Sequence, residues 1–395
     1  MKKICVVTGS RSEYGLLSRL IKMLEAHESF RLHLVVTGSH LSKEFGLTVN
    51  EIVADGIRVD QRIDIEIAGQ SSMEITTSIG KGVVAFADYF QSNKPDLLLV
   101  MGDRYEMVAV ALASFMANIP IVHISGGELS LGSKDDVLRH VITKLSSLHF
   151  VSAEQHRKRV IQLGEDPETV FKVGEPGLDD LHEIELLSRD TLEGLVGRKL
   201  DRKFFLMTFH PSGVNSKDER AENDVKPLLQ SLDQFSDRLV LCCLPNSDVG
   251  GDAIRGDLLA YERVNPDRFH LYGSHGRAAF LSLVALSELV IGNSSSTLVE
   301  VPMLGVPGVD VGNRQRGRLR GLSVVHARNE TGEIVKAINY ATSNVQKKIA
   351  GKRVSLYGDG YACERIMTIL EGLKLEEIGK RDFYDVDFVL PSLKS

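Results

Sequence analysis

The chain has 395 residues, of which 43% are hydrophobic and 25% are charged, and its formal net charge is -6. These values are typical of a globular protein with two or three domains, and they exclude the basic surface that binds nucleic acid. The first apolar run, residues 4–7, is shorter than a signal-peptide core, and no run reaches the roughly 18 apolar residues of a membrane-spanning helix. We therefore expect a cytoplasmic protein that has neither nucleic acid nor a membrane as its partner.

Several common cofactor and metal motifs are missing from the sequence. The four cysteines have no CxxC spacing and mostly lie in apolar runs, so neither a disulfide framework nor a zinc site is indicated. There is no GxGxxG after a strand, no GxxxxGK[ST], no HExxH and no GxSxG. A nicotinamide cofactor and a P-loop are therefore not expected.

One pattern repeats along the chain: a short apolar run, a polar or glycine-bearing turn, and then helical spacing. The apolar runs occupy residues 4–7, 33–36, 96–101, 120–124 and 149–151, and again residues 204–209, 239–244, 269–272, 289–291 and 306–311. This rhythm predicts two α/β domains, each a doubly wound, Rossmann-like parallel sheet, over residues 1–175 and 176–360. A helix near residues 361–380 is expected to cross back to the first domain.

The intervening segments are expected to be structural. Residues 107–117 and 278–287 carry apolar faces typical of core helices. The charged connector over residues 183–203 is expected to be a solvated face, and His123, His140 and His149 are expected to pack inside or behind a site.

The run LVIGNSSSTLVE, residues 289–300, predicts a buried strand, a tight turn and a helix start. Hydroxyl groups and backbone N–H groups at a helix N-terminus can bind a phosphate or pyrophosphate. Alternatively, Ser294 or Ser295 only caps the helix.

Charged and polar residues gather after the predicted strands, where open α/β sheets bind ligands. Two domains facing a cleft would suit a nucleotide sugar, with the nucleotide on the second domain and carboxylates from the first domain beside the sugar. Arg11 and Arg314 are candidates for the diphosphate, since a guanidinium matches phosphate oxygens, although either could be a surface ion pair. Asp103 follows an apolar strand, where burial can raise a carboxyl pKa into the range of acid–base catalysis. His210 ends a strand and is expected in the site.

Seven motifs occur in a specific order: GSRSEYG, GDRYE, GGE followed by DDVLRHVITKLS, FHP, PNSDVG, GNSSS and NRQRGR. In this order they resemble the hydrolysing UDP-N-acetylglucosamine 2-epimerases, the bacterial sialic-acid branch above all. The resemblance extends from about residue 3 to residue 385.

The resemblance implies a glycosyltransferase-B-like fold and a reaction without cofactor or metal. UDP-N-acetylglucosamine would lose UDP to give 2-acetamidoglucal, and water would then add to give N-acetylmannosamine. Relatives are commonly dimers or tetramers, so a homodimer or homotetramer is expected. The expected catalytic residues are Asp103, Glu128, Asp135 and His210, and the expected substrate- and UDP-binding residues are Arg11, Arg104, Asn246, Ser274, Ser294, Ser295, Glu300 and Arg314.

The sequence departs from the family pattern at Ser125, where several relatives carry glutamate and others histidine. Serine is a poor acid or base at neutral pH, so either Glu128 takes over that role or the substrate differs. The alternatives are a hydrolysing epimerase for a UDP-diacetamido sugar such as UDP-N,N'-diacetylbacillosamine, a non-hydrolysing epimerase, a glycosyltransferase of the same fold and a catalytically silent UDP-sugar sensor.

Overall fold

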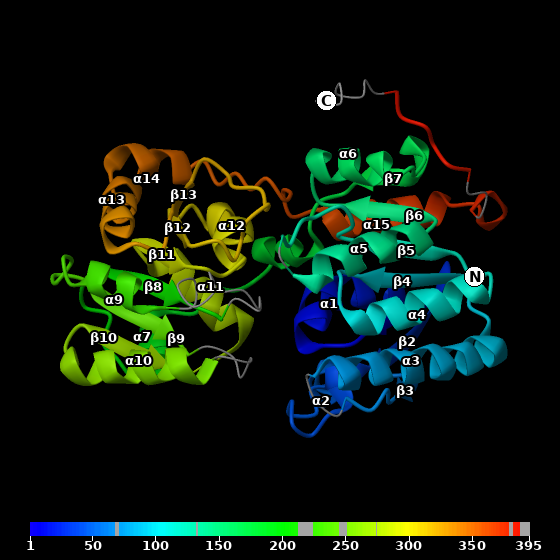
Figure 1. The fold of residues 1–395 in the computed structure, drawn as a ribbon, viewed down its shortest axis with the longest axis horizontal. Coiled ribbons are helices and arrows are strands. Elements are labelled where there is room, and N and C mark those ends of the chain that lie inside the picture. Colours follow the sequence, from blue (N-terminus) through cyan, green and yellow to red (C-terminus); the bar gives the residue numbers. More distant parts are fainter. Residues whose placement is uncertain are drawn as a thin grey trace, which may run out of the picture. The chain divides into compact units, whose positions relative to one another are not determined.

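The computed structural model describes residues 1–67, 71–131, 133–211, 224–244, 251–273, 275–378 and 382–387. The chain divides into two compact units (Figure 1). The first comprises Met1–Glu128, Lys134–Asp180 and Gly360–Ser395, and the second comprises Leu129–Ser133 and Leu181–Asp359.

The first unit is built on a seven-stranded parallel sheet with the order β3-β2-β1-β4-β5-β6-β7. Its strands are β1 (Lys2–Thr8), β2 (Phe30–Thr37), β3 (Gln61–Ile63), β4 (Leu97–Met101), β5 (Ile121–Ile124), β6 (Leu148–Val151) and β7 (Val170–Lys172). Its α-helices are α1 (Arg11–Ala26), α2 (Val49–Ala54), α3 (Ser72–Asn93), α4 (Tyr105–Met116), α5 (Lys134–Leu145), α6 (Glu154–Gln162) and α15 (Ala362–Gly372). Short 3-10 helices are η1 (Gly38–Leu41), η2 (Pro167–Thr169), η3 (Pro176–His182) and η5 (Leu375–Glu377).

Successive residues of these strands pack on opposite faces of the sheet, as the two-residue period of a strand requires. Ile4 and Leu99 join one core with residues of α1 and α15, whereas Cys5 and Leu98 join the other core with residues of α3 and α4. The sheet is therefore buried on both faces. The helix α15 lies against α1 although almost the whole chain separates them in sequence.

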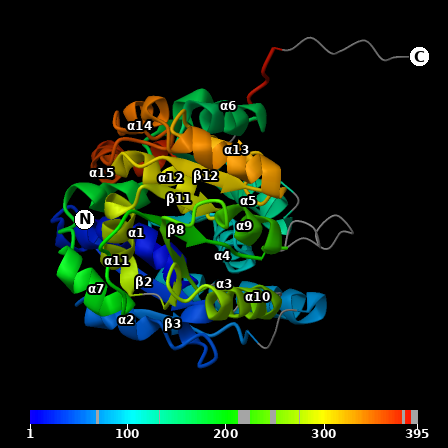
Figure 2. The ribbon, with the colours of Figure 1, turned by 90° about the vertical axis from the view of Figure 1, so that its left-hand side faces the viewer.

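The second unit repeats this plan with a six-stranded parallel sheet of order β10-β9-β8-β11-β12-β13 (Figure 2). Its strands are β8 (Phe204–Thr208), β9 (Leu239–Cys243), β10 (Phe269–Tyr272), β11 (Leu289–Gly292), β12 (Gly308–Val311) and β13 (Val324–Ala327). Its helices are α7 (Arg189–Val196), α9 (Lys226–Leu232), α10 (Gly251–Val264), α11 (Gly276–Leu286), α12 (Ser296–Val299), α13 (Thr331–Ala341), α14 (Asn344–Ala350) and the 3-10 helix η4 (Val301–Leu304). Residues of α9 and α13 pack on one face and residues of α7 and α11 on the other.

These observations confirm the predicted fold class, and strands form in all ten of the predicted segments. The core positions expected for residues 107–117 and 278–287 are also confirmed, in α4 and α11. His123 and His149 are fully buried, as expected. The four cysteines are free thiols. None of the described helices has the length and apolar composition of a membrane span.

The charged side chains of the connector over residues 183–203 are mostly exposed, as expected, but the connector also has buried apolar side chains. Leu192 and Leu200 are fully buried, and both belong to the core of the second unit. The connector contains the short helix α7, whose N-cap is Ser188, and its apolar side chains cover one face of the sheet. The sequence does not reveal this role, because charged residues stand between the few leucines that pack in the core of the second unit.

Candidate functional site

In the first unit, the turn after β4 holds Asp103 at the carboxyl edge of the sheet. Gly102 has φ of +80°, a conformation that favours glycine, and its N–H donates to the carbonyl of Ile124 at 3.0 Å. The Nε2 atom of His123 donates to the Gly102 carbonyl at 2.8 Å. Burial lowers the pKa of His123 to about 3, so this imidazole stays neutral and supports the turn. His123 thus lies behind the site, as expected.

A buried arginine of α5, Arg139, connects Asp103 to the next strand. Its Nη2 forms an ion pair with the Asp103 carboxylate, and its Nη1 donates to the Ser125 carbonyl at 2.7 Å. The guanidinium is almost fully buried, so the pair holds Asp103 firmly. The environment of Asp103 is therefore a charge pair and not the apolar pocket that its preceding strand indicates.

Glu128 belongs to a second buried group. The Ser152 hydroxyl donates to Oε1 of Glu128 at 3.1 Å and also lies 2.9 Å from Nδ1 of His156. Ser152 has one hydroxyl proton, so Nδ1 is the donor in the second bond. Asp135 lies in the first turn of α5 and is exposed, one helical turn before Arg139. It is therefore accessible to a ligand.

The predicted arginines of the first unit are both in ion pairs. Arg104 precedes α4 and its Nη2 lies 2.7 Å from the buried carboxylate of Glu106. Arg11 begins α1 and pairs with Glu51 at 2.9 Å, with more than half of its side chain exposed. An exposed pair of this kind contributes little to stability, so Arg11 can turn toward a ligand at small cost.

A buried carboxyl that the sequence did not single out, Glu13, lies beside this group. Its Oε2 accepts the N–H of Gly9 at 2.8 Å. Burial raises the pKa of Glu13 to about 7, and the charge of Arg104 opposes this shift. Glu13 thus places a carboxyl with a raised pKa in the first turn of α1, just after β1.

In the second unit, the predicted nucleotide-binding residues gather around Asn293, which is 1% exposed. Its Oδ1 accepts the N–H of His210 at 2.7 Å, and its Nδ2 donates to the His210 carbonyl at 2.8 Å. Arg314 donates through Nη1 to the Asn293 carbonyl at 3.1 Å and through Nε to the Pro211 carbonyl at 3.3 Å. Gln315 donates to the same Asn293 carbonyl at 2.9 Å. Asn293 therefore ties together the ends of β8, β11 and β12, which are neighbours in the sheet.

The glycine before Asn293 permits this close approach. Gly292 has φ of +143°, and a Cβ atom there would lie 1.7 Å from the Thr208 carbonyl oxygen. No side chain fits at this position. The backbone of the turn from β11 thus packs directly against β8, beside the hydrogen bonds that the Asn293 side chain makes to His210.

The serine cluster forms the predicted turn but only a short helix. Ser295 is the N-cap of α12, which has four residues before Pro302 and η4 follow. Proline disfavours the α conformation of the residue before it, which explains the early end. A single turn has a small dipole, so Arg314 and the hydroxyls of Ser294 and Ser295 must provide most of any phosphate binding.

Glu300 lies at the end of α12, and its Oε1 is 3.4 Å from Nη1 of Arg277. Arg277 is the second residue of α11, so this pair joins α11 to the serine turn. Asn246 and Ser274 lie outside the described residues.

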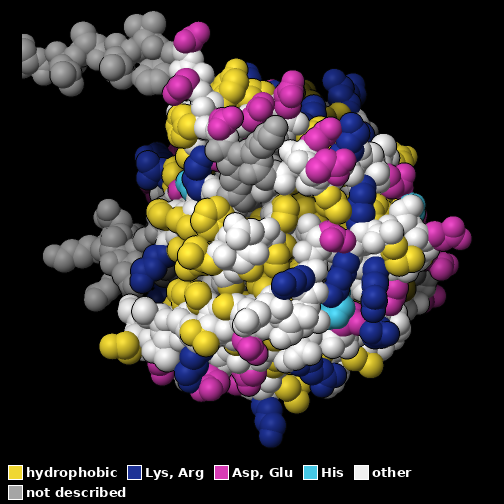
Figure 3. Space-filling view, turned by 90° about the vertical axis from the view of Figure 1, so that its right-hand side faces the viewer, with side chains coloured by type: hydrophobic (Ala, Val, Ile, Leu, Met, Phe, Trp, Pro, Cys, Tyr) yellow, Lys and Arg dark blue, Asp and Glu magenta, His cyan; other side chains and the backbone are white. Residues whose placement is uncertain are grey.

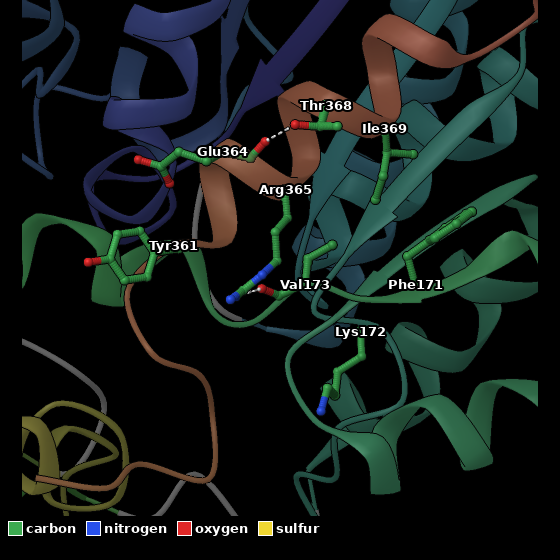
Figure 4. A pocket seen from close by; sticks show the side chains of 8 residues that line it. All are labelled: Phe171, Lys172, Val173, Tyr361, Glu364, Arg365, Thr368 and Ile369. Atoms are coloured by element: carbon green, nitrogen blue, oxygen red, sulfur yellow. Dashed lines mark hydrogen bonds between the residues drawn. The ribbon is translucent and has the colours of Figure 1, made fainter.

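A pocket of about 360 Å³ lies between β7 and α15 of the first unit (Figure 4). Phe171, Val173 and Ile369 give it apolar walls, and Arg365 donates to the Val173 carbonyl at 2.9 Å. Of the predicted site residues that the structure describes, none lines this pocket. It is therefore separate from the two groups at the strand ends.

The structure thus brings predicted residues together within each unit. Asp103 and Arg104 follow β4, Glu128 follows β5, and His210, Ser294 and Arg314 surround one asparagine. Sequence reasoning placed Arg139 among the charged residues after the first-domain strands but did not predict its pairing with Asp103, and it missed the roles of Asn293 and Gln315. A signal existed for Arg139, because it lies four residues after Asp135 on the same helical face.

The family model described as UDP-N-acetylglucosamine 2-epimerase matches residues 22–371. A Campylobacter jejuni protein named GDP/UDP-N,N'-diacetylbacillosamine 2-epimerase (hydrolyzing) is 34% identical over 98% of this chain and 99% of its own length. The Escherichia coli polysialic acid biosynthesis protein P7 is 35% identical over 98% of both chains. A Legionella pneumophila protein named UDP-N,N'-diacetylbacillosamine 2-epimerase (hydrolyzing) is 35% identical over 95% of this chain and 97% of its own length.

Among solved structures, the UDP-GlcNAc 2-epimerase from Neisseria meningitidis bound to UDP-GlcNAc has a TM-score of 0.79 at 19% identity, covering 94% of this chain and 100% of that chain. A structure from Listeria monocytogenes described as a UDP-N-acetylglucosamine 2-epimerase has a TM-score of 0.79 at 18% identity, covering 98% and 100%. These similarities establish the glycosyltransferase-B-like fold that the motifs predict.

Proposed function

Because the chain belongs to the UDP-N-acetylglucosamine 2-epimerase family, we propose that it converts UDP-N-acetylglucosamine and water to UDP and N-acetylmannosamine. The observation that carries the proposal is the group around Asn293, where His210, Ser294 and Arg314 lie at three neighbouring strand ends. These donors suit a nucleoside diphosphate. A charge-assisted hydrogen bond contributes roughly 1.5–3 kcal/mol, so Arg314 supplies much of the affinity.

The carboxylates of the first unit act on the sugar. A carboxylate removes the proton from C2 while UDP departs from C1, which gives 2-acetamidoglucal; water then adds at C1, and an acid delivers a proton that exchanges with solvent to the opposite face of C2. Asp103 is the first candidate for the base, since Arg139 fixes its position. Glu128 and Asp135 are the other candidates, and the ion pair of Arg104 with Glu106 keeps a cation at the same edge of the sheet.

A second substrate is a UDP-diacetamido sugar, UDP-N,N'-diacetylbacillosamine. Two of the relatives at 34% and 35% identity carry that substrate in their names, which supports this alternative as well. The two sugars differ at C4 and C6, so the chemistry at C1 and C2 is unchanged. Measuring turnover of each UDP-sugar distinguishes between the two candidate substrates.

The test is product analysis by anion-exchange chromatography. The purified protein is incubated with each UDP-sugar, with and without EDTA. We expect UDP and the free 2-epimeric sugar in equal amounts from one substrate, at a rate that EDTA does not change. UDP-N-acetylmannosamine as the product would contradict the hydrolysing reaction, and loss of activity with EDTA would contradict a metal-free one.

We further propose a homo-oligomer formed through the first unit. Neighbouring helices α4 and α5 expose large apolar side chains, and hydrophobic side chains gather on one face of the molecule (Figure 3). The exposed apolar side chains of α4 and α5 include Leu112, Phe115, Met116, Val137 and Val141. Exposed apolar groups of this number are typical of an interface. Light scattering should give a dimer or tetramer for the wild type and a smaller mass for Phe115→Glu with Met116→Glu; a wild-type monomer would contradict the proposal.

A further inference from the structure

Ser125 and Glu175 form a buried pair beside the Asp103–Arg139 ion pair. The Ser125 hydroxyl donates to Oε2 of Glu175 at 3.1 Å, and the two residues are 5% and 7% exposed. Arg139 donates to the Ser125 carbonyl while it pairs with Asp103. The four residues therefore form one connected group at the ends of β4, β5 and β7.

The backbone holds both members of this pair in place. Ser125 has φ of +62°, an uncommon conformation for serine, and its N–H donates to the Phe150 carbonyl at 2.9 Å. Glu175 precedes η3, and its carbonyl accepts the N–H of Leu178 at 3.0 Å. The contact between the two side chains is therefore set by two fixed turns. Left-handed backbone at a non-glycine residue costs free energy and is common at functional sites.

Other buried carboxylates of this unit have structural partners. Asp179 accepts the backbone N–H groups of Ala362 and Cys363, which anchors α15. Glu165 pairs with Lys144 and lies 3.2 Å from Nε2 of His149. Glu175 and Glu128 each accept from a serine hydroxyl, a group that can take a proton and pass one on, and the serine that Glu175 contacts is the one bound to Arg139 of the Asp103 group.

The proton balance of the proposed reaction requires such a group. Epimerisation inverts C2, so the base that takes the C2 proton from one face does not return it; an acid on the opposite face supplies the new C2 proton, and both groups exchange protons with solvent. The water that adds at C1 also loses a proton, and this proton needs an acceptor beside C1. A serine hydroxyl alone is too weak a base to take this proton. When the hydroxyl donates to a carboxylate, the carboxylate can accept the hydroxyl proton as the serine oxygen takes the new one.

We propose that Ser125 and Glu175 are the relay that accepts the proton of the attacking water. This inference rests on the proposed function and deepens it. As the water oxygen bonds to C1, its O–H bond breaks and the proton bonds to Oγ of Ser125. The former hydroxyl proton of Ser125 passes to Oε2 of Glu175, which later releases it to solvent. Glu175 acts through Ser125 and is a positioning residue, whereas Ser125 contacts the water.

The proposed relay accounts for the serine at position 125, where relatives carry glutamate or histidine, by pairing it with a carboxylate that the sequence did not predict. The sequence left two readings, that Glu128 takes over the missing role or that the substrate differs, and the Glu128 carboxylate is bound by Ser152, which also contacts His156. Glu175 is the carboxylate that contacts Ser125 itself.

The test compares E175Q, E175D and S125A with the wild type on the UDP-sugar that the wild type turns over. In E175Q the amide oxygen still accepts the Ser125 hydroxyl, but it cannot take the proton at neutral pH. We expect the rate of free sugar formation to fall by about 100-fold or more, the size of a general-base contribution, while KM changes less than about threefold. Elimination continues, so 2-acetamidoglucal accumulates beside UDP. E175D should recover part of the rate, and S125A/E175Q should be no slower than either single variant.

The matched control is E165Q, which also changes a buried glutamate of the first unit to its amide. It should release no glucal and should form free sugar at near the wild-type rate. The relay is wrong if E175Q forms free sugar at the wild-type rate, if its glucal does not accumulate, or if E165Q has the same effect. A wild type that releases no UDP from any UDP-sugar would instead contradict the proposed function itself.

Discussion

Replacing Asn293 with alanine should both destabilise the second unit and weaken UDP binding. The substitution removes the 2.7 Å and 2.8 Å hydrogen bonds to the backbone of His210. Each bond lost from a buried group costs about 1–3 kcal/mol, so the two bonds together give a loss of about 2–6 kcal/mol in the free energy of unfolding. For a unit of this size, Tm should fall by roughly 4–24 °C.

The same change releases the end of β8 from β11 and so displaces His210 relative to Arg314. We expect the Kd for UDP to rise by about tenfold or more, which corresponds to about 1.4 kcal/mol. Asn293→Asp should weaken UDP binding further, since it adds a negative charge beside the proposed pyrophosphate position. Differential scanning fluorimetry gives Tm, and isothermal titration calorimetry with UDP gives Kd.

Asn265→Ala is the matched control. Asn265 also makes two side-chain hydrogen bonds, to Tyr261 and Arg268, but it precedes β10 and so lies at the amino edge of the same sheet. This variant should lose some stability and bind UDP as the wild type does. If N293A bound UDP with unchanged Kd, Asn293 would not organise the nucleotide site; if N293A and N265A weakened UDP equally, the effect would be general destabilisation.

Three further substitutions test individual residues. Asp103→Asn should lower kcat by about 100-fold or more while the Kd for UDP, measured by calorimetry, stays within about threefold; a large loss of UDP affinity would move Asp103 out of its catalytic role. Arg314→Ala should raise the Kd for UDP by at least about tenfold, and an unchanged Kd would contradict its contact with the phosphates. Glu13→Gln should change the pH dependence of stability: the pKa of Glu13 is raised to about 7 from 4.5, so its contribution is complete below pH 4.5 and is lost as pH rises through 7. Urea titrations should show the wild type losing up to about 3 kcal/mol between pH 4.5 and pH 8 relative to E13Q, and parallel pH profiles would refute this.

Much of the fold could be predicted because its core strands are continuous apolar runs followed by glycine or polar turns. The runs at residues 97–101 and 204–208 are fully buried in the centres of their sheets, and burial on both faces requires just such sequences. The edge strands β3, β7 and β13 escaped prediction because QRI, VFK and VVHA are only three or four residues long and partly exposed. Short edge strands carry little hydrophobic signal.

The site could be predicted only in part, because motifs identify candidate site residues but not the side chains that contact and orient them. Asp103 and Arg314 were identified from their places after strands, yet the partner of Asp103 is Arg139, which is 36 residues away. The contact between Ser125 and Glu175 spans 50 residues and depends on β5 and β7 belonging to one sheet. No local pattern in the sequence indicates that distance.

The most direct test of the central claim is proton NMR of the protein with UDP-N-acetylglucosamine in deuterated water. We expect free UDP together with N-acetylmannosamine that carries deuterium at C2, because the C2 proton leaves and solvent supplies its replacement. N-Acetylmannosamine with the original hydrogen at C2 would contradict the elimination. UDP-N-acetylmannosamine in place of free UDP would contradict the hydrolysing reaction.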